Sequence, residues 1–118
     1  MSGRLAAEED RPSVSIVTIV RNGATTLGRA VQSVLSQEYP KIEYIVVDGG
    51  STDGTLDVIR SQDDRIAVWV SETDAGISDA FNKGIAFAHG DIVGILNSDD
   101  WYEPGAINAV VHALVESG

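Results

Sequence analysis

The hydrophobic pattern of the chain predicts four strands that alternate with four helices. Continuous apolar or β-branched runs predict buried strands over residues 14–20, 42–47, 65–70 and 91–96. Amphipathic or short helices are predicted around residues 27–35, 55–61, 77–88 and 104–114. Pro104 suits the first turn of the last helix, because a proline there gives up an N–H that has no helical partner. This order predicts an α/β fold with a mainly parallel sheet flanked by helices.

Polar side chains gather at the predicted carboxyl end of every strand. They are Arg21 and Asn22 after the first strand, residues 48–53 after the second, 72–79 after the third and 97–100 after the fourth. Ligands of parallel sheets bind outside the carboxyl ends of the strands, so these four loops form the predicted binding edge. A merely solvated edge would also be polar, but it would not need acids or glycines at every strand end.

The fourth loop carries two adjacent carboxylates, Asp99 and Asp100, directly after an apolar strand. Like charges side by side repel each other unless water, a cation or a helix N-terminus offsets them. Mg²⁺ commonly takes one or two carboxylates together with the phosphate oxygens of a substrate. The pair therefore indicates either a divalent-metal site that carries phosphates or an ordinary polar turn between a strand and a helix.

Composition narrows the classes of partner. The 118 residues include 18 acids and 8 bases, a formal net charge of −10, whereas nucleic-acid grooves need clustered Lys and Arg. No nucleic-acid partner is expected, and an anionic nucleotide would need a cation as mediator. The absence of cysteine excludes disulfides and thiolate metal sites. No apolar run approaches the roughly 18 residues of a membrane span, so no membrane segment is expected in this chain.

The chain length fits one modest domain. Residues 1–12 are polar and acid-rich and lack the apolar core of a signal peptide, so we expect them to form a flexible tail. Residues 13–118 carry the alternating pattern without a repeat or an internal linker, so we expect one domain there.

Two common nucleotide-binding motifs are absent. The first turn, residues 21–25, lacks the G-x-G-x-x-G that lets a backbone approach a pyrophosphate, and the chain has no Gly-Lys-Ser/Thr of a P-loop. A receiver-type phosphorylation domain is also disfavoured, because its acid pair would follow the first strand rather than the fourth. The remaining nucleotide-binding mode is one in which residues at several strand ends contact the nucleotide and a metal ion binds its diphosphate.

Five ordered blocks carry a resemblance to a known family. They are residues 14–17 with Asn22, 30–37, 45–55, 76–84, and 90–93 leading to 97–100. In these blocks the chain resembles the N-terminal half of a family 2 glycosyltransferase, which implies a truncated, Rossmann-like GT-A domain for nucleotide-diphosphate sugars. The resemblance also implies a UDP-sugar donor, Mg²⁺ or Mn²⁺ as cofactor, and a glycan or lipid-linked acceptor in the full-length protein.

The resemblance has further implications for mechanism and setting. It implies transfer with inversion in bacterial polysaccharide synthesis, in the cytoplasm or at the inner face of the membrane for a full-length form. The catalytic base of the family comes from the later half of the domain, so we expect it beyond residue 118. The chain would then carry donor binding only and would be inactive alone. The alternative is a non-catalytic nucleotide-binding or interaction module.

The resemblance assigns metal and sugar roles to the fourth loop. Asp99 matches the second acid of the D-x-D motif and is the predicted metal ligand. Asp100 either holds a metal-bound water or caps the following turn. Asn97 replaces the first acid of the motif, and its amide can still accept a ribose hydroxyl. Ser98 lies between them and is predicted to contact the nucleotide sugar.

The resemblance also assigns nucleotide contacts to the other loops. Arg21 stands where the family often has a Tyr, and its guanidinium can stack on the base or pair with an acid. Asn22 matches the family and is a predicted contact. Asp48 either accepts the uracil N–H or bonds its own glycine turn, because Gly49 replaces the second acid of this motif. Asp79 either touches the nucleotide or stabilises the first turn of its helix.

Two further expectations concern structure rather than chemistry. Asp53 is expected to cap the short helix over residues 55–61, since short acids are favoured at that position. A truncated domain leaves an apolar sheet edge and helix faces exposed, and such surfaces favour self-association. We therefore expect a homo-oligomer.

Overall fold

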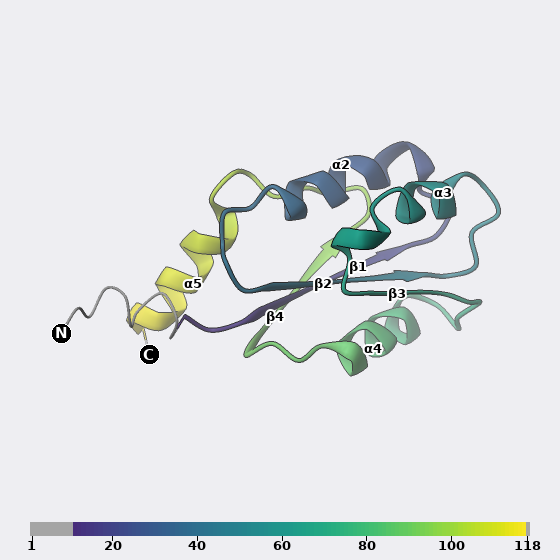
Figure 1. The fold of residues 1–118 in the computed structure, drawn as a ribbon. Helices are drawn as coiled ribbons and strands as arrows, with labels where there is room; N and C mark the ends of the chain where they lie inside the picture. The colour runs from purple at the N-terminus through teal and green to yellow at the C-terminus, as the bar shows by residue number, and fades with distance from the viewer. Residues whose placement is uncertain (1–10, 118) are drawn as a thin grey trace.

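The computed structural model describes residues 11–117, which form a parallel sheet with helices on both faces (Figure 1). The elements in chain order are β1 (Val14–Val20), α2 (Ala24–Leu35), β2 (Ile42–Asp48), α3 (Thr55–Arg60), the 3₁₀ turn η1 (Asp63–Arg65), β3 (Val68–Ser71), α4 (Ile77–Phe87), β4 (Ile92–Asn97) and α5 (Ala106–Ser117). The four strands are all parallel in the order β3-β2-β1-β4. The predicted α/β class and parallel sheet are confirmed.

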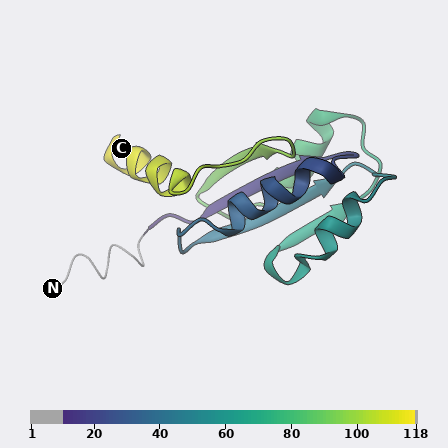
Figure 2. The same ribbon diagram turned by 90° about the horizontal axis from the view of Figure 1, so that it is seen from above.

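The pleat of the sheet divides the core into two layers. Ile16 and Tyr44 belong to the layer under α2 and α3, which also receives the buried side of α5. Val17 and Ile45 belong to the layer under α4. Figure 2 shows α2 running along the sheet on one side and α5 beyond one end of it. The strand runs are apolar at consecutive positions because both faces of β1 and β2 are covered.

A glycine sets the distance between α4 and the sheet. A Cβ at Gly84 would lie 2.3 Å from Cγ1 of Val17 on β1, so only a residue without a side chain allows this approach. Nearer the start of α4, Ala80 belongs to the same buried cluster as Ile19 and Val47, which lie toward the carboxyl ends of β1 and β2. The loop between β3 and α4 is therefore brought to the predicted binding edge.

The third strand is shorter than predicted. Residues 65–70 were expected to be extended, but residues 63–65 form η1 and β3 begins only at Val68. The side chain of Asp63 accepts the indole N–H of Trp69 at 2.6 Å, and the Arg65 guanidinium donates to the carbonyl oxygen of Leu35 at 3.1 Å. These contacts stabilise a turn where β-branched periodicity alone predicts a strand.

The last helix also begins later than predicted. Pro104 lies in a turn before α5, not in its first turn. The reason is Gly105, whose φ of 79° is left-handed and interrupts the right-handed helical path. The helix starts at the next residue, Ala106.

The expected tail lies mostly outside the described residues. Its last two residues, Arg11 and Pro12, contact Tyr39: the Tyr39 hydroxyl donates to the Pro12 carbonyl oxygen, and the Arg11 guanidinium lies 5.9 Å from the ring centroid. The described part of the chain thus begins two residues before the predicted domain. Between residues 11 and 117, no helix combines the length and the apolar character needed to cross a membrane.

Candidate functional site: a cavity at the carboxyl edge of the sheet

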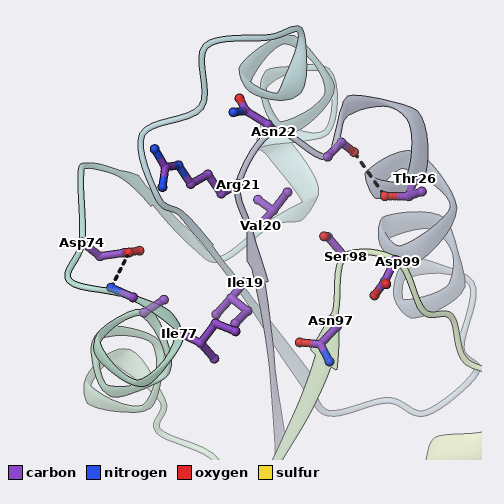
Figure 3. A pocket seen from close by; sticks show the side chains of 13 residues that line it. Ile19, Val20, Arg21, Asn22, Thr26, Asp74, Ile77, Asn97, Ser98 and Asp99 are labelled. Carbon is purple, nitrogen blue, oxygen red and sulfur yellow. Dashed lines mark hydrogen bonds between the residues drawn. The ribbon is translucent and has the colours of Figure 1, made fainter.

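An open cavity of about 610 Å³ lies at the carboxyl ends of β1 and β4 (Figure 3). Its wall comes from the end of β1, the start of α2, the β3–α4 loop and the turn after β4. The lining residues are Ile19, Val20, Arg21, Asn22, Gly23, Thr26, Asp74, Gly76, Ile77, Ala80, Asn97, Ser98 and Asp99. A concave site at this edge is where a parallel sheet is expected to bind its ligand.

The structure brings five of the predicted site residues to this cavity. They are Arg21, Asn22, Asn97, Ser98 and Asp99. The register of the sheet explains why these residues lie close together. Ile19 of β1 pairs with Asn97 of β4, so the residues that follow the two strands are neighbours. Asp48, Asp79 and Asp100 are not part of the cavity wall.

Asp48 is fully buried, and its carboxylate is used by the turn that follows β2. Oδ2 accepts from the N–H groups of Gly50 at 3.1 Å and Ser51 at 2.9 Å, and from the Ser71 hydroxyl at 2.8 Å. Oδ1 accepts from the Ser51 hydroxyl. Of the two alternatives from the sequence, the contacts match the one in which Asp48 bonds its glycine turn. This carboxylate ties β2, its turn and β3 together.

Asp79 lies in the first turn of α4 and holds the preceding loop. Its Oδ2 accepts the N–H of Ala75 at 3.0 Å and lies 3.5 Å from Nζ of Lys83, which also lies 3.1 Å from Glu72. The hydrogen bond from Ala75, helped by the charge of Lys83, lowers the pKa of Asp79. Partial burial opposes ionisation of Lys83, but the two carboxylates outweigh it and raise the Lys83 pKa.

Asp53 joins the starts of two helices instead of capping one. The N-cap residue of α3 is Gly54, so the expected capping position is off by one residue. Asp53 accepts the hydroxyl and the N–H of Thr55, the latter at 2.9 Å, and accepts the N–H of Ala24 at 3.2 Å. The Thr55 hydroxyl bond is the largest cause of the lowered Asp53 pKa. Of the amide donors at the start of α2, that of Ala24 is therefore used by Asp53.

Asn22 connects the turn after β1 with the turn after β2. Its backbone is left-handed, with a φ of 52°, a conformation that Asn tolerates better than most residues. Its N–H donates to the Ser51 hydroxyl at 2.7 Å, and its Oδ1 accepts the N–H of Thr52 at 2.8 Å. Asn22 therefore shapes the rim of the cavity as well as lining it.

The acid pair lies in a turn after β4, with both side chains exposed. The N–H of Asp100 donates to the carbonyl oxygen of Asn97 at 3.0 Å and closes the turn. Within residues 11–117, neither the Asp99 nor the Asp100 side chain makes a hydrogen bond or an ion pair. The oxygens of both carboxylates are therefore available to water or a cation. Of the two side chains, only the Asp99 carboxylate lines the cavity.

Helix α2 anchors the chain that follows the acid pair. The Ser33 hydroxyl accepts the N–H of Tyr102 at 3.0 Å. The guanidinium of Arg29 lies 3.2 Å from the centroid of the Trp101 ring, which is a close cation–π stack. Gln37 donates to the carbonyl oxygen of Glu103 at 2.9 Å. These contacts fix the segment that leaves the turn, and thereby the position of the acid pair.

The fit of a divalent cation can be judged from the available ligands. Among the described residues, no three His, Cys, Asp or Glu side chains converge as a metal cage. One or two carboxylates at a cavity mouth still suit Mg²⁺ or Mn²⁺ when the other ligands are diphosphate oxygens and water. The donor set therefore fits a cation that arrives with its nucleotide, and it does not fit an ion held by protein alone.

Two polar lining residues, Thr26 and Asp74, were not singled out from the sequence. Asp74 belongs to the polar loop after the third strand, so its approximate place was predictable but its direction was not. Thr26 lies in the first turn of α2, where its hydroxyl donates to the Gly23 carbonyl oxygen at 3.4 Å. No motif distinguishes it from other helix-start threonines.

Comparison with known proteins identifies the family of this site. The sequence model of the family described as "Glycosyl transferase family 2" matches residues 15–118. The chain belongs to glycosyltransferase family 2. The glycosyltransferase Rv1514c of Mycobacterium tuberculosis is 41% identical over 109 residues, which cover 91% of this chain and 42% of the relative. The succinoglycan biosynthesis protein ExoU of Rhizobium meliloti is 37% identical over 101 residues, covering 83% of this chain and 29% of the relative.

A solved structure gives the same fold for this family 2 chain. The mannosyltransferase PcManGT of Pyrobaculum calidifontis, determined with GDP-Man and Mn²⁺, superposes with a TM-score of 0.77 and 29% identity. The match covers 91% of this chain and 32% of that structure. The fold is therefore that of GT-A glycosyltransferases, as the sequence predicted. The chain spans less than half the length of these relatives.

Proposed function

We propose that this chain binds the donor of a glycosyl transfer, a nucleotide-diphosphate sugar with a UDP group, together with Mg²⁺ or Mn²⁺. The supporting observation is that Asp99, Asn97, Arg21 and Asn22 line one cavity. A carboxylate for a cation and a guanidinium for a base or phosphate are the two kinds of group that such a donor requires. The net charge of −10 makes the cation necessary for an anionic ligand.

Each residue has a proposed part in holding the donor. Asp99 ligates the cation, and Asp100 reaches it through a bound water. A bound cation would neutralise charge that develops on the diphosphate leaving group. Asn97 and Ser98 accept or donate hydrogen bonds to sugar hydroxyls, which polar side chains at the end of β4 can do without adding charge.

Arg21 and Asn22 hold the nucleoside side of the donor. Arg21 makes no hydrogen bond or ion pair within the described part of the chain, so its guanidinium is available to stack on the base. Asn22 keeps the rim in shape and offers its amide NH₂ group. Asp48 and Asp79 contribute by fixing the turns beside the cavity rather than by direct contact.

The complete reaction is proposed for the longer protein. A base in a later segment would deprotonate the acceptor hydroxyl, and a single displacement would invert the anomeric centre. The acceptor is a growing glycan or a lipid-linked sugar of a bacterial polysaccharide, at the cytoplasmic side of the membrane. This chain alone would bind donor without transferring sugar.

The test of donor binding is titration calorimetry of the purified protein with UDP and with GDP, each with and without Mn²⁺. We expect binding of UDP that requires the cation. Loss of an outer-shell partner typically weakens metal affinity about 10–100-fold, and we expect Asp99→Ala to cost at least as much. Asp57→Ala is the matched control, because it removes one exposed carboxylate on α3, away from the cavity.

Three outcomes would contradict the proposal. Equal affinity of wild type and Asp99→Ala for UDP with Mn²⁺ would show that Asp99 is not a metal ligand. Tighter binding of GDP than of UDP would show that the donor does not carry uridine. A full-length gene product that binds UDP but neither transfers nor hydrolyses its sugar would favour the alternative, a non-catalytic nucleotide-binding module. That alternative is motivated by the missing acids at Asn97 and Gly49.

A further inference from the structure

The β3–α4 loop places the Asp74 carboxylate against the backbone of Gly49, at the end of β2. A Cβ built on Gly49 would lie 2.8 Å from Oδ2, 3.4 Å from Cγ and 3.5 Å from Oδ1 of Asp74, and these are its three nearest atoms. Asp74 thus fills the space that a side chain at residue 49 would need. The absence of that side chain is what allows Asp74 to lie there.

The Asp74 carboxylate is held in place through one oxygen, and its other oxygen is available to a ligand. Oδ1 accepts the N–H of Gly76 at 3.1 Å, which fixes the side chain relative to its own loop. Oδ2 has no hydrogen-bond partner within residues 11–117. The loop is also fixed at its start, where the N–H of Glu72 donates to the carbonyl oxygen of Asp48 at 3.0 Å. An oriented acceptor therefore faces the cavity.

The cavity has two polar sides (Figure 3). Arg21 and Asp74 lie on one side, and Asn97, Ser98 and Asp99 lie on the other. The second side holds the carboxylate that suits a cation and diphosphate. The first side offers a cationic donor and an anionic acceptor together, which matches a heterocycle that has carbonyl oxygens next to a ring N–H. A phosphate would match Arg21 but would be repelled by Asp74.

We propose that Asp74 recognises the nucleobase. Its Oδ2 accepts the ring N3–H of uracil, while the Arg21 guanidinium stacks on the base or donates to the carbonyl groups that flank N3. This inference rests on the proposed binding of a UDP-sugar and assigns a specificity-determining residue to it. Cytosine has an unprotonated N3 at the same place, so a carboxylate there repels it. A site built to accept this proton should reject the base that lacks it.

The first experiment compares UDP and CDP in the presence of Mn²⁺, using wild type and Asp74→Asn. The amide is nearly isosteric, but it can donate to cytosine N3 where the carboxylate could only accept. We expect wild type to prefer UDP by about tenfold or more, and Asp74→Asn to lose that preference or reverse it. Asp57→Asn is the control with the same chemical change outside the cavity, and it should keep the wild-type ratio.

The second experiment moves the carboxylate. Asp74→Ala should weaken UDP binding about tenfold or more, and the double variant Asp74→Ala/Gly49→Asp should recover most of it. Gly49 does not have a left-handed backbone, and the three atoms nearest to a new Cβ all belong to Asp74, so the double variant leaves room for the new side chain. Recovery would show that the position of the charge, and not the fold of the loop, sets affinity.

The outcomes separate this inference from the proposed function. Wild type that binds no nucleotide would overturn the proposed function and this inference with it. Wild type that binds UDP, with an unchanged UDP-to-CDP ratio in Asp74→Asn, would overturn the role of Asp74 alone. The same holds if Asp74→Ala weakens binding and the double variant, folded by circular dichroism, fails to restore it.

Discussion

The aspartates at the carboxyl edge of the sheet differ in whether their oxygens are already used. Asp48 and Asp53 accept several hydrogen bonds from nearby turns and helix starts, and Asp79 accepts one and pairs with Lys83. Asp99 and Oδ2 of Asp74 accept none within residues 11–117. A saturated carboxylate fixes loops, whereas an unsaturated one at a cavity can take a ligand. The contacts therefore distinguish the acids that fix loops from the two that we propose as ligands of the donor.

The same residues show what sequence could predict of the site. Residue type and strand periodicity predicted the edge of the sheet and five of its lining residues, including Arg21 and Asp99. They left open whether Asp48 bonds its own turn or the base, and they did not predict its bond from Ser71, because that contact joins two separate strands. Nor did they predict that Asp74 fills the space beside Gly49, since the two residues come from different loops.

At the residue scale, Asn22 offers a test of how backbone conformation supports the cavity rim. Asn22→Ala removes the bond to Thr52 and places a less tolerant residue at a φ of 52°, so we expect a loss of about 1–2 kcal/mol in unfolding free energy. Asn22→Gly removes the same bond but accepts this φ, and it should lose less. Urea denaturation of both variants measures the difference. A glycine variant that is no more stable than the alanine variant would argue against backbone strain.

At the scale of elements, α2 and the residue that follows its end stabilise the loop that carries Asp99, the proposed metal ligand. Gln37, just beyond the helix, donates to the carbonyl oxygens of Ser33 at 3.0 Å and Glu103 at 2.9 Å. Its Oε1 accepts the N–H of Ile107 in the first turn of α5 at 3.2 Å. One side chain therefore connects α2, the loop and the start of α5. This connection joins a segment remote from the cavity to the chain that follows the acid pair.

We predict that Gln37→Ala lowers both stability and cation-dependent UDP affinity. Three hydrogen bonds are lost, one of them to a helix-start amide, so we expect about 1–2 kcal/mol less unfolding free energy. Gln32→Ala is the matched control, because Gln32 is exposed on α2 and its side chain makes no such bonds. Denaturation and titration calorimetry measure the two effects. Equal behaviour of the two variants would mean that the anchoring contacts are dispensable.

The bounds of the strands and helices show which element ends the hydrophobic pattern can predict. β1 forms over the predicted residues 14–20, because a strand buried on both faces is apolar throughout. β3 and α5 begin later than predicted. In those cases an Asp–Trp hydrogen bond and the left-handed Gly105 decide the local path, and neither appears in hydrophobic periodicity.

At the scale of the whole molecule, one face of β4 is uncovered. α4 packs mainly on β1 and β2, whereas β4 is an edge strand of the sheet. Val93 and Ile95 point to that face and are 42% and 45% exposed. Ile77 on α4 is 68% exposed. An edge strand with an apolar face is a template for association with another chain.

We therefore predict that the purified protein self-associates through the β4 face in a concentration-dependent manner. Burying an isoleucine contributes about 1.5–3 kcal/mol, so placing a charge at Ile95 should weaken the association constant about tenfold or more. Size-exclusion chromatography with light scattering can compare Ile95→Lys with Gln32→Lys, which adds the same charge on exposed α2. A wild-type protein that stays monomeric at high concentration would refute self-association. Equal dissociation by both lysine variants would instead indicate that net charge, which both make less negative, controls assembly rather than the β4 face.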